Sequence, residues 1–98
     1  MSLFSLFGPT KKYPQDRHQI TTEQVKHIMW NTHLASINQA NKDTVAEAVL
    51  AKRDGEGKTS LQHIYETLTR LKNEKRITKI DRDSFMKIFL EFFTEQFK

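Results

Sequence analysis

The sequence predicts an all-α fold, a small bundle of about four helices with short connections. Two observations lead to this prediction. Apolar residues recur at helical spacing in separate stretches of the 98-residue chain, and polar or glycine-containing breaks with helix-capping patterns lie between those stretches. A chain of this length has room for one such domain.

The N-terminal region differs from the rest of the chain. Apolar residues crowd residues 1–7, and residues 8–14 hold both prolines and one of the three glycines. Prolines and glycine interrupt regular structure, which predicts a linker. We therefore expect residues 1–18 to form an N-terminal apolar peptide with a flexible linker. Residues 19–98 are expected to form a single helical domain in which order begins near Ile20.

The first predicted helix starts at Thr21. Gln24 follows three residues later, which is the spacing of a capping box, and apolar residues flank the box as a hydrophobic staple. Val25 opens an apolar stripe, but Trp30 lies to one side of it. The helix is therefore either buried over a broad face or broken near residues 31–34.

A pair of helices is predicted in the middle of the chain. Thr44 begins a second capping-box pattern and opens a short alanine-rich helix that extends to about Arg53. Residues 54–57 contain two glycines and predict a turn. A further helix then begins at Thr59 or Ser60.

This third helix has the clearest apolar stripe. Its i, i+3, i+4 and i+7 positions are apolar, and its other face is polar, which predicts one buried face and one solvated face. The stripe consists of Leu61, Ile64, Tyr65, Leu68 and Leu71, and the polar face of Gln62, His63, Glu66, Thr67, Arg70 and Asn73.

The last helix carries most of the aromatic residues. Asp81 is its predicted N-cap, with Ile80 and Phe85 as the hydrophobic staple. Five of the seven phenylalanines lie in the last fourteen residues. With neighbouring aliphatic residues they cover an arc of about 200°, whereas packing on one neighbour needs roughly 100°. This helix is therefore expected to have two partners.

The sequence contains no residue pattern for catalysis or metal binding. Cysteine is absent, which excludes disulfides and thiolate ligands. The four histidines form no i, i+4 pair and no HExxH motif, and no GxSxG nucleophile motif is present. We expect a non-enzymatic protein without catalytic residues, metal, cofactor or small-molecule substrate.

The predicted location is the cytoplasm. No apolar run approaches the roughly twenty residues needed to span a bilayer. Residues 1–7 lack the basic start and the length of a secretory signal. The absence of cysteine agrees with a reducing compartment.

The turn at residues 54–57 has some features of a phosphate loop. Gly57, Lys58 and Thr59 reproduce the end of the pattern GxxxxGK[ST]. Lys52 stands where the first glycine belongs, and the residues before the turn predict a helix, whereas a phosphate loop follows a strand. The turn is therefore predicted to connect two helices without holding a phosphate.

The same turn resembles the middle of an EF-hand calcium loop, because helices are predicted on both sides of it. Asp54, Glu56 and Gly57 match the third, fifth and sixth loop positions. The pattern departs at Lys52, Thr59 and His63, which replace an acidic ligand, a branched aliphatic residue and the bidentate glutamate. The resemblance implies at most an EF-hand-like helix–turn–helix without calcium. A helix-turn-helix of the DNA-binding kind is the other interpretation of this middle pair.

The main functional hypothesis is a protein–protein interaction module, meaning an adaptor, regulator or assembly subunit. The second side of the last helix is predicted to bind another protein or a second copy of the chain, and a homodimer is the simplest form. The competing explanation is that residues 1–7 fold back over that side. The candidate partner-binding residues are Met86, Phe89, Leu90, Phe93 and Phe97.

The alternative hypothesis is nucleic-acid binding by a helix-turn-helix or winged-helix arrangement. The formal net charge is +4 with a pI of 9.5, and the excess of cations lies in residues 70–82. Cations near a helix C-terminus also have an ordinary explanation in the helix dipole. The base-reading residues would be Gln62, His63 and Glu66, and the candidate phosphate-binding residues are Lys58, Arg70, Lys72, Lys75, Arg76 and Lys79.

A third hypothesis places residues 1–7, which are followed by Lys11 and Lys12, on an anionic membrane surface. So short a peptide gives weak, reversible binding at best. Membrane contact through these residues is therefore not the expected role.

Overall fold

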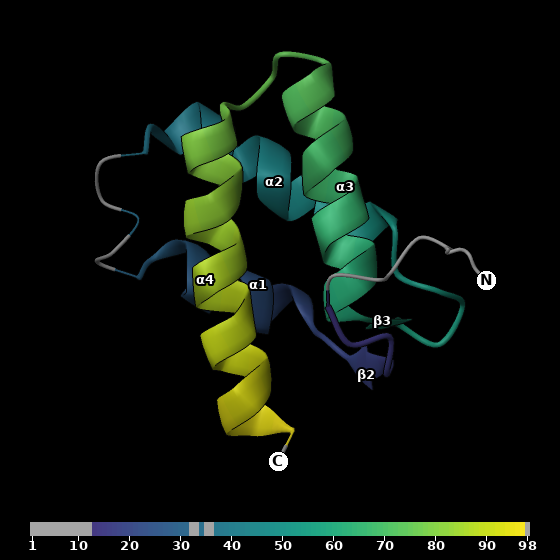
Figure 1. Ribbon diagram of the computed structural model, residues 1–98. Helices are drawn as coiled ribbons and strands as arrows, with labels where there is room; N and C mark the ends of the chain where they lie inside the picture. The colour runs from purple at the N-terminus through teal and green to yellow at the C-terminus, as the bar shows by residue number, and fades with distance from the viewer. Residues whose placement is uncertain (1–12, 32–33, 35–36, 98) are drawn as a thin grey trace, which may run out of the picture.

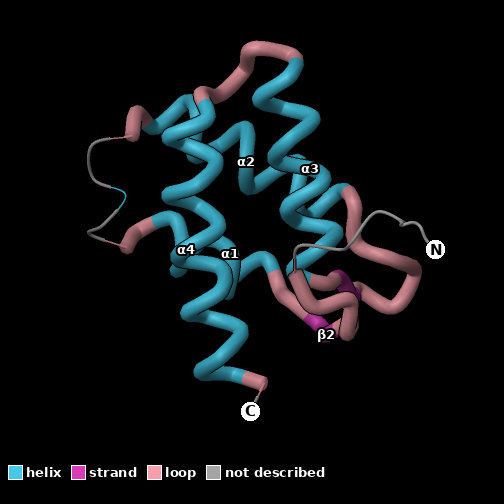
Figure 2. The backbone as a smooth tube through the Cα atoms, viewed as in Figure 1, coloured by secondary structure: helices cyan, strands magenta, loops and turns pink. Residues whose placement is uncertain are grey.

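The computed structural model describes residues 13–31, 34 and 37–97 (Figure 1). In chain order its elements are β2 (His18–Gln19), α1 (Thr22–Met29), α2 (Gln39–Ala51), β3 (Lys58–Thr59), α3 (Leu61–Asn73) and α4 (Lys79–Gln96). Helices form the body, and the strands of the described residues are one pair of two residues each (Figure 2). The all-α prediction is therefore confirmed. The predicted apolar peptide at residues 1–7, together with Lys11, Lys12 and His33, lies outside the described residues.

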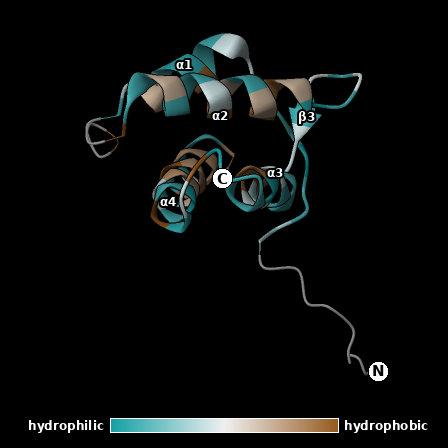
Figure 3. Ribbon diagram, turned by 90° about the horizontal axis from the view of Figure 1, so that it is seen from above, coloured by the Kyte–Doolittle hydropathy of each residue, from teal (hydrophilic) through white to brown (hydrophobic). Residues whose placement is uncertain are grey.

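The helices form two layers. Seen along α3 and α4, the helices α1 and α2 lie together across that pair (Figure 3). The pair α3 and α4 is antiparallel because a short turn joins them (Figure 1). The core lies between the layers and includes Val25, Val49, Leu68, Phe85 and Phe89, none of which exposes more than 1% of its surface. None of the described helices has both the length and the apolar character needed to cross a bilayer.

The start of α1 follows the prediction. The N–H of Gln24 donates to Thr21 Oγ1 at 3.1 Å, and the N–H of Thr21 donates to Gln24 Oε1 at 2.9 Å, which completes the capping box. The helix ends at Met29 with Trp30 as its C-cap. Of the two alternatives for this helix, the break before residues 31–34 is therefore the observed one. It leaves the Trp30 side chain 84% exposed.

Two predicted helix starts are wrong. α2 begins at Gln39, not at Thr44, because Asn38 caps it: the N–H of Asn41 donates to Asn38 Oδ1 at 2.8 Å. The polar residues between them have adequate helix propensity, so a good cap is enough to extend the helix backwards. Thr44 is an interior residue of α2.

α4 likewise begins earlier than predicted. Thr78 is the N-cap, and Asp81 occupies the third helical position of the capping box. The N–H of Asp81 donates to Thr78 Oγ1 at 3.0 Å, and the N–H of Thr78 donates to Asp81 Oδ2 at 3.3 Å. The residue before the cap is thus Ile77, which is buried. Ile80 is 78% exposed, so the predicted staple of Ile80 and Phe85 does not form.

The apolar stripe of α3 is buried as predicted except for Tyr65, which is half-buried, and the polar face is not fully solvated. Ser60 caps the helix, and Leu61, Ile64, Leu68 and Leu71 lie in the core. Gln62 and Thr67, predicted to face solvent, are also buried. Gln62 is covered because the preceding segment of chain packs on it, and the Thr67 hydroxyl donates to the His63 carbonyl at 2.9 Å.

That covering segment begins earlier than the expected start of order at Ile20. The N–H of Tyr13 donates to Gln62 Oε1 at 2.9 Å, and the N–H of Gln62 donates to the Pro14 carbonyl at 3.1 Å. β2 then pairs antiparallel with β3, His18 opposite Thr59 and Gln19 opposite Lys58. Residues 13–19 thus contact the N-terminal end of α3. The division of the chain after residue 18 stays a prediction.

Candidate functional site

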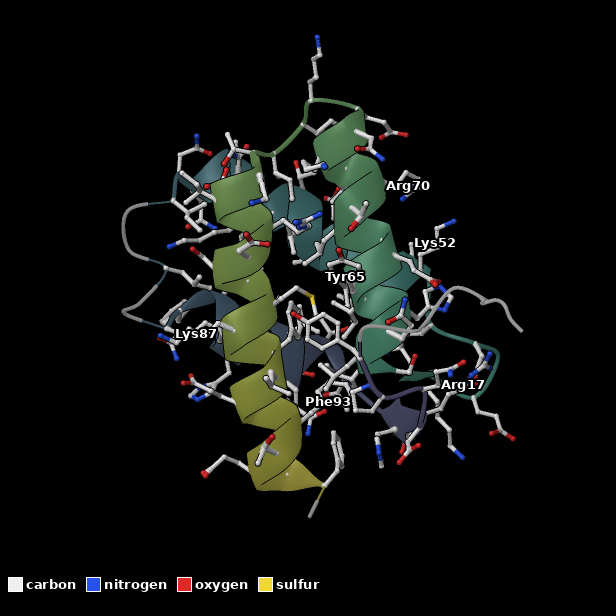
Figure 4. The ribbon with its side chains drawn as sticks, in the orientation of Figure 1. Arg17, Lys52, Tyr65, Arg70, Lys87 and Phe93 are labelled. Carbon is white, nitrogen blue, oxygen red and sulfur yellow. The ribbon has the colours of Figure 1, made fainter. Side chains whose placement is uncertain are left out.

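The predicted partner-binding residues of α4 do not share a surface. Met86 and Phe89 are 1% and 0% exposed and Phe93 is 6% exposed, so these three belong to the core. Leu90 is 41% exposed, and Phe97 is half-buried. Figure 4 shows Phe93 directed into the space between α4 and the N-terminal segment.

These residues of α4 are buried because the two packing partners of the helix belong to its own chain. α3 packs along one side of α4, and α1 contacts another. The broad apolar arc is therefore mostly covered, as a helix that is central in its domain requires. What stays exposed is the margin of the arc at Leu90, next to the C-terminal half of α1.

A hollow of about 750 Å³ lies at this margin, between α1 and the C-terminal half of α4. We call it the α1–α4 groove. Buried Ile28 and Ile88 and half-buried Phe92 make its base apolar, and exposed Glu91 and Glu95 make its rim acidic. Its remaining lining residues are His27, Asn31, Leu90, Thr94 and Gln96.

Leu90 is a ridge between this groove and a second hollow of about 180 Å³. The second hollow is bounded by the N-terminal segment, including Pro14 and His18, and by Phe93 and Phe97. The His18 ring stacks on the Phe97 ring with centroids 4.3 Å apart and planes 9° apart. This contact ties the end of α4 to β2 and shapes the smaller hollow.

Sequence reasoning missed the contribution of α1 to this surface. Trp30 is the most exposed of the described large apolar residues, and it directly precedes Asn31, which lines the groove. The available signal was its position to one side of the α1 stripe. The helix stops at Met29, and Trp30, its C-cap, lies in solvent.

The predicted phosphate-binding residues separate into two groups. Arg70, Lys72, Lys75, Arg76 and Lys79 lie at the turn between α3 and α4. Lys58 lies before the other end of α3, about 20 Å away for a helix of 13 residues. Its ammonium pairs with Glu56 at 3.3 Å. The six cations therefore do not form one patch.

The predicted base-reading end of α3 is covered. Gln62 is 8% exposed, and it holds hydrogen bonds to Tyr13 and to Glu66 at 2.9 and 3.0 Å. His63 is half-buried, and Glu66 is exposed. A helix that enters a groove of DNA presents these N-terminal side chains to base edges, and here the chain itself occupies part of that surface.

The turn between α2 and α3 is organised around the Asp54 carboxylate. The N–H groups of Glu56 and Lys58 donate to Asp54 Oδ1 at 2.8 and 3.0 Å, and Arg17 Nη1 lies 3.1 Å from Oδ2. The backbone hydrogen bond from Lys58, then that from Glu56, then Arg17 lower the pKa of Asp54 from its usual value. Gly57 has φ 78°, which suits glycine.

The acidic group of this turn faces donors of the protein, unlike a ligand of the EF-hand loop that the sequence resembles. Asp54 accepts backbone N–H groups and an arginine, where a calcium ligand would face the cation. Among the described residues, no group of three or more histidine, aspartate or glutamate side chains is arranged to hold a metal ion.

The fold and its exposed surface define a small all-α protein with an apolar groove between two helices. Comparisons with protein-family models, with curated proteins and with solved structures found no match for this chain.

Proposed function

We propose that this protein is a non-enzymatic protein–protein interaction module whose α1–α4 groove binds an amphipathic helix of a partner protein. The observation that carries the proposal is the groove itself, about 750 Å³ with an apolar base, bordered by exposed Leu90. A groove between two helices is the kind of surface that takes the apolar face of a third helix.

The rim of the groove indicates the charge of the partner. Glu91 and Glu95 are exposed, and neither forms an ion pair with a described cation. They form a local acidic pair on a chain whose net charge is +4. Complementary charge gives specificity and faster association, so the partner helix is expected to carry lysine or arginine beside its apolar face.

The exposed apolar residues supply the anchors of this interface. Leu90 is 41% exposed on α4, and Trp30 is 84% exposed at the end of α1. Tryptophan is strongly enriched among the residues that dominate interface energies. Leu90 borders the groove and Trp30 directly precedes its lining residue Asn31, so the exposure of these two large apolar side chains supports a partner-binding surface here.

Affinity capture from a cell extract tests the proposal with matched variants of the full chain. Leu90→Asp and Trp30→Ser are expected to lower the capture of specific partners at least tenfold. Lys87→Asp, which places an aspartate on an exposed position of α4 outside the groove and changes the charge by two units where Leu90→Asp changes it by one, is expected to leave capture unchanged. Equal capture by all variants, or no protein captured above a blank support, would contradict the proposal.

Two further results identify what binds in the α1–α4 groove. If light scattering finds a dimer that Leu90→Asp dissociates, the partner is a second copy of this chain. If Phe4→Ser with Phe7→Ser increases capture, residues 1–7 compete for the groove in the same chain. Glu91→Lys with Glu95→Lys is expected to weaken capture of a basic partner, and unchanged capture would remove the charge argument.

No described contact favours the helix-turn-helix alternative. Its reading residue Gln62 is buried, and its cations are divided between the two ends of α3. We therefore do not propose a base-reading function.

A further inference from the structure

The turn between α3 and α4 carries an uncompensated positive charge. Arg70, Lys75, Arg76 and Lys79 are exposed and Lys72 is half-buried, and none of them forms an ion pair with a described carboxylate. Together with Ile80 we call these residues the basic tip. Glu74 is the one exposed acid between positions 70 and 80. The local field is therefore strongly positive.

The acids that follow this stretch in the sequence are already engaged. Asp81 accepts hydrogen bonds from the Thr78 N–H and from Asn41 Nδ2 at 3.3 and 3.4 Å. Asp83 pairs with Arg82 at 3.1 Å, and the Arg82 side chain is 7% exposed. These carboxylates stabilise the helix start and a buried arginine. They therefore do not neutralise the cations of the basic tip, which remain available to an anionic partner.

Lys75 occupies a backbone position that disfavours it. α3 ends in a Schellman motif, in which the N–H of Lys75 donates to the Lys72 carbonyl and the N–H of Arg76 to the Leu71 carbonyl, both at 2.9 Å. Glycine is the usual residue at the Lys75 position because its φ is 63°. Lys75 thus lies at the apex of the turn although its backbone conformation favours glycine. Such a residue indicates that its charge has a role.

Ile80 is exposed at the same end of the molecule. Its side chain is 78% exposed because Thr78, not Asp81, caps α4 and places Ile80 in the first turn. The turn lies at an extremity of the protein, opposite the C-terminus (Figure 1), and the longest dimension is 42 Å. A protruding end can touch a flat surface without obstruction from the other helices.

These features fit a lipid surface better than a nucleic acid. An apolar side chain next to several cations can enter the boundary between headgroups and acyl chains while the cations attract anionic headgroups. Phosphate contacts to a duplex make no use of Ile80, and the described aromatic side chains that could stack on bases lie elsewhere: Tyr65, for example, packs on Tyr13 and under Arg82.

We infer that the basic tip docks this protein on an anionic membrane surface. The interaction is peripheral and driven by charge, with Ile80 entering the interface. It is separate from the α1–α4 groove, which lies toward the other end of α4, a helix of about 27 Å. The protein could then hold a partner helix and a membrane at the same time, but the membrane contact does not depend on the groove.

Co-sedimentation of the full chain with lipid vesicles tests this inference. Binding is expected to vesicles of phosphatidylcholine with 30% phosphatidylserine, to fall steeply with salt, and to be absent from pure phosphatidylcholine. Lys75→Glu with Arg76→Glu is expected to lower the bound fraction at least tenfold, and Ile80→Ser severalfold. The control is Lys87→Glu, an exposed cation of α4 outside the basic tip, which is expected to change binding less than twofold.

The variant Lys75→Gly distinguishes an effect on vesicle binding from an effect on folding stability. The substitution removes a cation and relieves the positive φ, so it is expected to raise the melting temperature while it weakens vesicle binding about two- to fivefold. Loss of binding together with lower stability would instead point to a structural effect. This pair of readouts keeps the test valid even if the double charge reversal destabilises the turn.

Several outcomes would overturn the inference. Absence of binding to the anionic vesicles would do so directly. A loss with Lys87→Glu that is as large per reversed charge as the loss with the basic-tip variant would mean that net charge alone is responsible. Loss with Phe4→Ser and Phe7→Ser but not with the basic-tip variants would assign membrane contact to residues 1–7. Preferential binding to a duplex DNA or an RNA hairpin over vesicles at the same salt would replace the membrane by a nucleic acid.

Discussion

Single residues decide how the turn between α2 and α3 is held. The Asp54 carboxylate accepts two backbone N–H groups and faces Arg17, which comes from the segment before β2. It thereby closes the turn on itself and joins it to a distant part of the chain. The salt bridge is largely exposed, so the backbone hydrogen bonds are the more important contribution.

The pH dependence of stability should report this carboxylate. Hydrogen bonds to the charged form lower the pKa of Asp54 in the folded state below its ordinary value of 3.8. A lowered folded-state pKa means that the stabilisation is fully present above the ordinary value and is lost as the pH falls through the folded value. We expect Asp54→Ala to lower the melting temperature at pH 6, and the difference from the unmodified protein to shrink below about pH 4.

A thermal unfolding series from pH 6 to pH 2.5 measures that difference. Asp16→Ala, an exposed carboxylate of the preceding segment, is the matched control and is expected to leave the melting temperature nearly unchanged. A constant difference between Asp54→Ala and the unmodified protein across the series would show that the charge of Asp54 does not matter.

Helix caps decide where the elements begin. At α1 the capping box was predictable because its two members stand alone before an apolar stripe. At α2 and α4 the sequence predicts Thr44 and Asp81 as caps. The observed caps, Asn38 and Thr78, lie earlier in the chain in both cases. A longer helix forms more backbone hydrogen bonds, and the intervening residues have adequate helix propensity.

Alanine substitution distinguishes the two candidate caps of α2. Asn38→Ala should lower the free energy of unfolding by about 1 kcal/mol, because the Asn41 N–H loses its acceptor. Thr44→Ala, inside the helix, should change it by less than about 0.5 kcal/mol, since alanine is the better helix former. Urea denaturation of both variants measures the difference. The reverse order of effects would mean that α2 begins at Thr44.

At the scale of the whole molecule, α4 is the central element. Its apolar arc contacts α3 and α1, and the N-terminal segment approaches its end through His18. The same helix carries the basic tip at one end and borders the groove at the other. Burial therefore separates neighbouring residues into structural ones, such as Phe89, and surface ones, such as Leu90.

Substitutions at these two adjacent positions should differ sharply. Phe89→Ala should lower the free energy of unfolding by about 3–5 kcal/mol, because the side chain is fully buried and leaves a cavity. Leu90→Ala should cost less than about 1 kcal/mol, because its side chain is 41% exposed. Chemical denaturation checks both values. Similar losses at the two positions would contradict the assignment of Leu90 to the surface.

The sequence by itself left the break near residues 31–34 as one of two alternatives, and it determined the fold class, the capping box of α1 and the buried stripe of α3. These follow from local periodicity and from hydrogen bonds between residues three positions apart, which a sequence displays directly. It also showed that α4 has more apolar surface than one neighbour can cover.

Only the tertiary structure decided which of those apolar residues are covered and by what. Phe89 and Leu90 are both apolar, and their different exposure depends on where α1 and α3 pack. The groove and the burial of Gln62 under residues 13–14 both join parts of the chain that are distant in sequence. Such contacts depend on the packing geometry of whole helices, which local patterns do not encode.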